Sequence, residues 1–222
     1  MPLSDRRARL AEARLYFICE ARPPAGPLEQ VLEDALRGGV DVFQLREKHL
    51  ADEDILAVAA VARELCRAAG ALFIVNDRPD LAVAADADGV HVGQDDMGVD
   101  TARAAVGPDR LVGLSTHSAA QVDAARGADM IGVGPIYPTP TKLWRPAVGL
   151  ELIVYAREHA QVPFFAIGGI DDARAHEVAA AGAPRIAAVR AIAGAADPAG
   201  AARALRAVVE AVPLREAAHG PA

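Results

Sequence analysis

Eight short apolar runs, spaced fairly regularly along the 222 residues, constrain the fold of this chain more than any other feature. Each run is rich in Val, Ile, Leu and Phe, which predicts a buried β-strand. Ala-rich segments with helical periodicity lie between the runs, for example residues 51–70 and 171–182. Strands that are apolar throughout and alternate with helices indicate a parallel sheet covered by helices. The predicted strands are residues 15–19, 42–45, 72–75, 89–92, 111–115, 130–134, 164–168 and 186–189.

This pattern predicts an α/β fold of the (β/α)8 TIM-barrel class. Eight β/α units in 222 residues fit a compact barrel, and a doubly wound open sheet is the alternative on pattern alone. No linker or low-complexity segment interrupts the repeat, so residues 1–222 are predicted to form a single domain. A helix within residues 4–14 precedes the first strand and is expected to cover the bottom of the barrel, and the tail after about residue 212 is expected to fray.

Charge and composition exclude several classes of partner. The net charge of -7 argues against a nucleic-acid or anionic-membrane surface, since both generally need a basic patch. Residues 1–26 contain scattered charges and no long apolar run, so neither a secretory signal nor a membrane span is predicted, and a cytoplasmic location is expected. Cys19 and Cys66 lie within apolar patterns and lack paired ligand spacing, which indicates reduced core residues.

The residues that follow each strand are the candidates for function, because active sites of TIM barrels gather at the carboxyl ends of the strands. The second predicted strand contains Gln44 and runs into Arg46 and Lys48. Two cations one residue apart can lie on the same side of an extended segment and face one anion. A solvated loop is the alternative interpretation of these charges.

Acidic residues follow the next two predicted strands: Asn76 and Asp77 after the third, and Asp95 and Asp96 after the fourth. Neighbouring strands lie about 4.8 Å apart, so Asp77 and one of the later pair can reach a common point. Carboxylates that converge without histidine or cysteine favour a hard cation such as Mg²⁺. The alternative is that these aspartates cap the helices that follow them.

Two polar residues end the fifth predicted strand. Ser115 can exchange hydrogen bonds with a heterocycle, and His117 is either an acid or base or the start of the next helix. No GxSxG motif or evident aspartate partner accompanies them, so a hydrolase triad is not predicted.

The loop after the sixth predicted strand reads PIYPTPTK, residues 135–142. Its three prolines exclude helix and interrupt any strand, which predicts a stiff segment. The loop is either a connector or a ligand grip formed by Thr139, Thr141 and Lys142.

The seventh and eighth predicted strands end in a phosphate-binding pattern. Gly168 and Gly169 allow a ligand to approach backbone N–H groups, and Val189 and Arg190 follow the eighth strand. The loops at these two places often hold a phosphate in this fold. Together with the cations and carboxylates above, they suggest two anion sites and a reaction that joins two phosphorylated molecules.

At this point the chain resembles the thiamine phosphate synthase family. The resemblance rests on QLREK, VNDRPDLA, DGVHVGQDDM, GLSTHS, IGVGPIYPTPTK, PAVGL, AIGGI and AVRAI, which occur in this order over nearly the whole chain. It implies a (β/α)8 barrel and an Mg²⁺-assisted transferase that joins two small-molecule substrates. These would be 4-amino-2-methyl-5-hydroxymethylpyrimidine diphosphate and 4-methyl-5-(2-phosphoethyl)thiazole, giving thiamine phosphate and pyrophosphate.

The resemblance also implies roles for individual residues. The pyrimidine diphosphate would be bound by Gln44, Arg46, Lys48, Asn76, Ser115 and Lys142. The thiazole phosphate would be bound by Thr139, Thr141, Gly169, Val189 and Arg190. Mg²⁺ would be held by Asp77 and Asp96, with Asp95 the weaker candidate, and catalytic roles would fall to Arg46, Lys48, Ser115 and Lys142. Many family members have serine where this chain has Arg190, so the thiazole phosphate is either gripped more strongly here or held by the backbone alone.

The family's reaction is thought to be dissociative: diphosphate leaves first, and the thiazole nitrogen captures the pyrimidinylmethyl cation. Two alternatives stand beside this function. One is a thiazole tautomerase of the same barrel family, an alternative that the presence of His117 keeps open. The other is a non-catalytic phosphate-binding barrel, which would need neither the metal pair nor the leaving-group cations.

Overall fold

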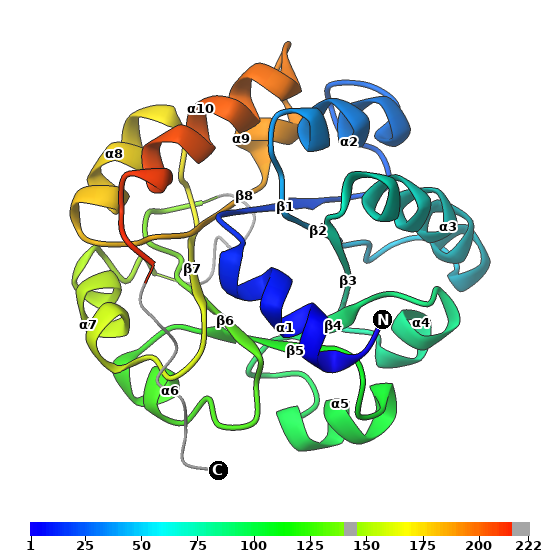
Figure 1. Cartoon of the computed structure of the whole chain (residues 1–222), viewed down its shortest axis with the longest axis horizontal. Coiled ribbons are helices and arrows are strands. Elements are labelled where there is room, and N and C mark those ends of the chain that lie inside the picture. Colours follow the sequence, from blue (N-terminus) through cyan, green and yellow to red (C-terminus); the bar gives the residue numbers. More distant parts are fainter. Residues whose placement is uncertain (140–145, 215–222) are drawn as a thin grey trace.

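The computed structural model describes residues 1–139 and 146–214 of the chain. Eight parallel strands form a closed barrel in which each strand pairs with its neighbours in sequence and β1 pairs with β8 (Figure 1). The TIM-barrel prediction is therefore confirmed, and the open-sheet alternative is wrong. The strands are β1 (Leu15–Cys19), β2 (Val42–Leu45), β3 (Leu72–Asn76), β4 (Gly89–Val92), β5 (Leu111–Thr116), β6 (Met130–Val133), β7 (Phe164–Ile167) and β8 (Ile186–Ala188).

Most helices surround the barrel, and a helix lies between each strand and the next along the chain (Figure 1). Their bounds are α1 (Leu3–Glu12), α2 (Leu28–Arg37), α3 (Asp52–Ala69), α4 (Pro79–Ala84), α5 (Val99–Val106), α6 (Ala119–Asp123), α7 (Glu151–His159), α8 (Asp172–Ala180), α9 (Arg190–Ala193) and α10 (Pro198–Glu210). The longest of these, α3, begins with three acidic residues and is followed by Gly70 in the left-handed conformation, as expected for a helix with a favourable dipole and a glycine C-cap. Within residues 1–139 and 146–214, no helix is both long and apolar enough to cross a membrane.

Side chains alternate along the strands between two buried clusters. Tyr16 and Ile18 of β1 point into the barrel, where they join Phe165 of β7. Phe17, between them, packs outward against the helices, and its ring lies 5.6 Å from that of Phe43. This period of two is the geometry of a β-strand, and burial on both faces explains why the strands read as continuous apolar runs.

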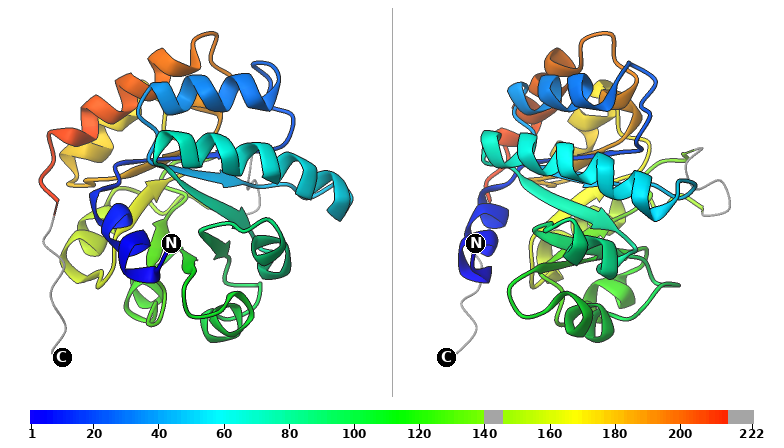
Figure 2. Two further views of the ribbon diagram at one scale, coloured as in Figure 1. Left: turned by 45° about the vertical axis from the view of Figure 1, so that its right-hand side comes forward. Right: turned by 90° about the vertical axis from the view of Figure 1, so that its right-hand side faces the viewer.

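Helix α1 covers one end of the barrel. In the right-hand view of Figure 2 it lies at the left edge, beside the ends at which the strands begin. Leu10 of this helix is 1% exposed and packs against the inner cluster, and Arg6 forms an ion pair of 2.8 Å with Asp88, which directly precedes β4. With this end covered, access to the barrel interior is left to the end at which the strands finish.

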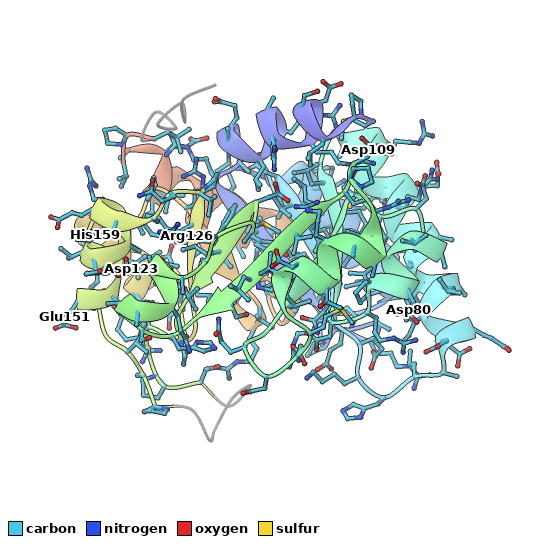
Figure 3. The ribbon with its side chains drawn as sticks, turned by 90° about the horizontal axis from the view of Figure 1, so that it is seen from below. Asp80, Asp109, Asp123, Arg126, Glu151 and His159 are labelled. Atoms are coloured by element: carbon cyan, nitrogen blue, oxygen red, sulfur yellow. The ribbon has the colours of Figure 1, made fainter. Side chains whose placement is uncertain are left out.

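Three aspartates secure the covered end. These are Asp41, Asp88 and Asp129, which directly precede β2, β4 and β6. Each carboxylate accepts a hydrogen bond from the backbone N–H of the first or second residue of the preceding strand. The N···O distances are 3.0, 3.0 and 2.8 Å respectively. The side-on view in Figure 3 shows the two ends: Asp109 lies beside α1, and Asp80 lies at the opposite end, where β3 has finished.

Candidate active site

A cavity of about 360 Å³ opens at the carboxyl ends of the strands. Every strand contributes to its lining, as expected for a TIM-barrel active site. The predicted site residues that line it are Gln44, Arg46, Asn76, Ser115, Thr139, Gly169, Val189 and Arg190. Thr141 and Lys142 lie outside the described residues.

The floor of the cavity holds a buried polar pair. Gln44 is 2% exposed, and its Nε2 donates a hydrogen bond of 2.5 Å to Oη of Tyr16. Burial raises the pKa of the Tyr16 hydroxyl far above its usual range, although the Gln44 contact acts in the opposite direction. Tyr16 is therefore neutral, and its oxygen holds the Gln44 amide in one orientation at the base of the cavity. The sequence contains no signal for this pair, since Tyr16 looks like any other strand residue.

Ser115 lies beside a buried histidine on the neighbouring strand. Nε2 of His91 is 3.1 Å from Oγ of Ser115, and the Ser115 carbonyl accepts a hydrogen bond of 2.7 Å from Nε2 of Gln94. His117 also lines the cavity, with Nδ1 in contact with the Gly134 carbonyl. Both histidines thus hold neighbouring groups of the β4, β5 and β6 ends in place.

Asp77 and Asp96 lie together at the rim of the site, next to Asn76, but neither of them lines the cavity, and nor does Lys48. The Asp96 carboxylate is close enough to raise the pKa of Asp77, after the larger effect of burial, and Nζ of Lys48 lies 3.6 Å from Oδ2 of Asp77 and lowers that pKa. Neither aspartate is a helix cap: α4 begins after Arg78 and α5 begins after Gly98, and neither helix has a side-chain cap bond. The capping alternative is therefore wrong. Asp77 itself adopts a left-handed backbone conformation with φ of 60°, which is uncommon outside glycine.

The donor set at this rim fits Mg²⁺ in part. Two converging carboxylates supply hard oxygen ligands, and a raised carboxyl pKa is what a cation placed between them would relieve. Over the described part of the chain, no group of three His, Cys, Asp or Glu side chains is placed to hold a metal ion. Waters and substrate oxygens would therefore have to complete the coordination, which is the usual arrangement for Mg²⁺ in phosphate sites.

Glu47, for which the sequence predicted no specific role, organises the basic loop after β2. Its carboxylate accepts backbone N–H groups from Lys48 at 2.8 Å, His49 at 3.0 Å and Ala21 at 3.2 Å. Burial would raise the pKa of Glu47, but these three hydrogen bonds outweigh it and lower the pKa. The Glu47 carboxylate thus binds the loop backbone. These hydrogen bonds fix the position from which the Lys48 side chain extends.

Packing requires the glycine pair after β7. Gly168 and Gly169 have φ of 105° and 67°. A Cβ on Gly168 would lie 2.5 Å from Cα of Pro135, and one on Gly169 would lie 2.9 Å from Cβ of Tyr137. The Gly168 carbonyl accepts a hydrogen bond of 3.0 Å from the Tyr137 backbone. The two glycines therefore let the loops after β6 and β7 form one wall of the cavity.

Two arginines face this wall. Arg190 lines the cavity from the first residue of α9 and is exposed, so its side chain is accessible to a ligand. Arg174, from the first turn of α8, also lines the cavity, and its Nη1 donates a hydrogen bond of 2.8 Å to the Gly169 carbonyl. Arg174 was not predicted from the sequence because it lies inside a helix, where an arginine is ordinarily a solvent-facing residue.

Comparison with known proteins agrees with this geometry. Residues 15–192 match the model of the family described as thiamine monophosphate synthase. The chain belongs to this family. The family prediction is confirmed, and the match runs from β1 into α9 and so includes every strand of the barrel.

Relatives named thiamine-phosphate synthase are about half identical to this chain over the residues that align. The protein from Acidothermus cellulolyticus is 50% identical over 200 residues, which is 88% of this chain and 94% of that protein. The protein from Thermosynechococcus vestitus is 48% identical over 199 residues, which is 89% of this chain. The chain spans only 56% of the length of that second relative.

A solved structure of the family has the same architecture. The thiamine phosphate pyrophosphorylase from Pyrococcus furiosus superposes with a TM-score of 0.83 at 35% sequence identity. The superposition covers 92% of this chain and 98% of that structure. The barrel and its helices are therefore shared along almost the whole of both chains.

Proposed function

We propose that this chain is a thiamine phosphate synthase. It would condense 4-amino-2-methyl-5-hydroxymethylpyrimidine diphosphate with 4-methyl-5-(2-phosphoethyl)thiazole and release pyrophosphate. The main support is that two sides of one cavity carry groups suited to binding. Gln44, Asn76 and Ser115 line the cavity from one half of the barrel. Gly169 and Arg190 line it from the other half. Membership of the thiamine monophosphate synthase family supports it.

The first side suits an aminopyrimidine. Because Nε2 of Gln44 donates to Tyr16, the amide oxygen of Gln44 is the group left to accept a hydrogen bond from the ring. Asn76, the last residue of β3, would lie beside the ring, and the Ser115 hydroxyl would contact its amino group. The ring would thus be fixed by neutral polar groups that do not withdraw electron density from it.

The diphosphate would lie toward the rim. Arg46 lines the cavity and Lys48 lies beside Asp77, so two cations would face the leaving group. Lys142 would join them by its motif position in the loop after β6. Asp77 and Asp96 would hold Mg²⁺, which when bound neutralises charge on phosphate oxygens.

The chemistry needs positioning and charge stabilisation more than a protein nucleophile. An aminopyrimidine can delocalise the positive charge that develops at its methylene carbon as the C–O bond to diphosphate breaks. Arg46 and Lys48 would stabilise the negative charge that builds on the departing diphosphate. The thiazole nitrogen would then donate its electron pair to the methylene carbon, provided that the wall near Gly169 holds the thiazole in line with it.

The second side would hold the thiazole phosphate. Backbone N–H groups of Gly169 and Val189 and the guanidinium of Arg190 are donors suited to phosphate oxygens. Thr139, which lines the cavity, would add a hydroxyl, and Thr141 would do so by its motif position.

A cytoplasmic location remains a prediction of the sequence.

The test is a purified-protein assay with both substrates and Mg²⁺, in which each component is omitted in turn. The proposal expects thiamine phosphate only when all three are present. A parallel incubation with a thiazole carboxylate phosphate tests the tautomerase alternative. Isomerisation of that compound, with no thiamine phosphate from the complete mixture, would replace the proposed function. Tight phosphate binding without turnover of either mixture would favour a non-catalytic barrel.

A further inference from the structure

Arg174 makes two contacts that join separate loops of the cavity wall. Its Nη1 donates to the carbonyl of Gly169 in the loop after β7, at 2.8 Å. Its Cζ lies 4.8 Å from the centre of the Tyr137 ring, in the loop after β6, as in a cation–π contact. One guanidinium therefore links the two loops that form this side of the cavity.

Tyr137 is held by the same helix a second time. Its hydroxyl donates a hydrogen bond of 2.6 Å to Oε2 of Glu177, three residues beyond Arg174 on α8. Residues three apart lie on one face of a helix, so Arg174 and Glu177 grip the ring and the hydroxyl of Tyr137 from neighbouring positions. The backbone of Arg174 is fixed as well, because its N–H donates a hydrogen bond of 3.0 Å to the Asp171 carboxylate that caps α8.

The contact with Gly169 also fixes a peptide plane. In a trans peptide the N–H points opposite to the carbonyl, so a guanidinium that holds the Gly169 carbonyl sets the direction of the Ile170 N–H. Gly169 has a φ of 67°, and glycine has little intrinsic preference that would keep its backbone in this state. Arg174 supplies a constraint that the residue itself lacks.

We propose that Arg174 is a positioning residue for the thiazole phosphate: it locks the loops after β6 and β7 together so that Gly169 and its neighbours present a preformed phosphate cradle. This inference rests on the proposed function, because it names that substrate. It differs from a direct charge–phosphate role, in which Arg174 would contact the ligand and the Tyr137 ring would be irrelevant. The two roles predict different behaviour of the same variants.

The test is calorimetric titration of the full chain with the thiazole phosphate alone, so that binding is measured without turnover. Arg174→Ala removes both contacts and should weaken binding about tenfold, as expected for a lost hydrogen bond and cation–π contact. Tyr137→Leu should weaken binding in the same direction, and the double variant should lose less affinity than the sum of the two single losses, since both single variants remove the contact between Arg174 and the Tyr137 ring. Arg174→Gln, which keeps a donor for the Gly169 carbonyl, should recover part of the loss. His176→Ala, an exposed site on the same helix, is the matched control and should bind like the parent.

Kinetics supply a second readout. In Arg174→Ala the KM for the thiazole phosphate should rise about tenfold, while the KM for the pyrimidine diphosphate stays within about twofold, because that substrate lies across the cavity. If Arg174→Ala fails to fold, Tyr137→Leu and Arg174→Gln still measure the linkage.

The outcomes separate the two proposals. Equal affinity of the parent and Arg174→Ala, or losses in Arg174→Ala and Tyr137→Leu that simply add, would overturn the positioning role and leave the proposed function standing. A parent that binds the thiazole phosphate but forms no thiamine phosphate would overturn the proposed function, and the ratios of dissociation constants would still decide the role of Arg174. A parent that does not bind the thiazole phosphate would overturn both.

Discussion

Replacing Asp129 with asparagine should lower stability and leave the active site intact. The Asp129 side chain is 0% exposed at the end of the barrel covered by α1. Its Oδ1 accepts from Nε of Arg7 at 2.7 Å, and its Oδ2 accepts from the Val112 backbone at 2.8 Å and from Arg103. Asparagine keeps the size of the side chain and one oxygen for Val112, but it loses the charge and turns an NH₂ group toward a guanidinium.

The size of the effect follows from the exposure of the partners. Breaking a fully buried ion pair costs about 3–5 kcal/mol. Here the Arg7 and Arg103 side chains are 58% and 25% exposed, so water can still solvate both cations after the change. The free energy of unfolding of Asp129→Asn should therefore fall by the lower figure, about 3 kcal/mol, which corresponds to a Tm about 6–12 °C lower for a chain of this length.

Urea unfolding and calorimetry of the parent and Asp129→Asn measure this change. Asp109→Asn is the matched control, because Asp109 lies at the same end, is exposed, and contributes its backbone carbonyl rather than its carboxylate to Arg6. The control removes the same charge and should unfold like the parent. Both variants should keep parental KM values at a temperature where they are folded. A Tm of Asp129→Asn equal to that of the control would refute the stated role of the buried carboxylate, and an altered KM would refute the separation of the two ends.

Three further predictions concern the open end of the barrel. Gly168→Ala places a Cβ 2.5 Å from Cα of Pro135 at a φ of 105°. The free energy of unfolding should therefore fall by about 1–3 kcal/mol, and binding of the thiazole phosphate should weaken. Parental values in urea unfolding and calorimetric titration would show that this wall of the cavity tolerates a side chain. Asp77→Asn should abolish turnover, because on the proposed function it removes a carboxylate that would hold Mg²⁺. Near-normal rates at limiting Mg²⁺ would contradict that assignment. Arg190→Ala should raise the KM for the thiazole phosphate more than that for the pyrimidine diphosphate, and unchanged steady-state constants would rule out a binding role for this guanidinium.

The barrel was predictable because its strands are buried on both faces. Burial makes each strand a continuous apolar run, and the eight predicted runs match the observed strands to within one residue at either end. Closure of the sheet is a long-range property, and the sequence could only favour it through the number of repeats. Contacts that depend on closure were out of reach, such as the pairing of Arg7 with Asp129 across 122 residues.

The site was predictable to the extent that position after a strand implies position at the cavity. This reasoning found Gln44 and Ser115, which line the cavity, and Asp77 and Asp96, which lie together at the rim of the site. It did not find Arg174, whose contact with Gly169 depends on how α8 leaves the barrel.

Local patterns were also ambiguous where two physical roles use one residue type. Aspartates ahead of short helices suited both capping and metal binding, and the backbone shows that α4 and α5 are capped by neither Asp77 nor Asp96. The glycines after β7 suggested close approach of a ligand, whereas the nearest atoms to a Cβ on Gly168 belong to Pro135 in the loop after β6. Only the packed structure separates such roles.

The stoichiometry of the complete reaction shows whether the cavity joins the two substrates. With pyrimidine diphosphate limiting and Mg²⁺ and thiazole phosphate in excess, thiamine phosphate and pyrophosphate are measured together until the reaction stops. We expect both products to reach the amount of pyrimidine diphosphate supplied, in a ratio of one to one. Pyrophosphate released without thiamine phosphate, or neither product from folded protein, would contradict the claim that this cavity joins the two substrates.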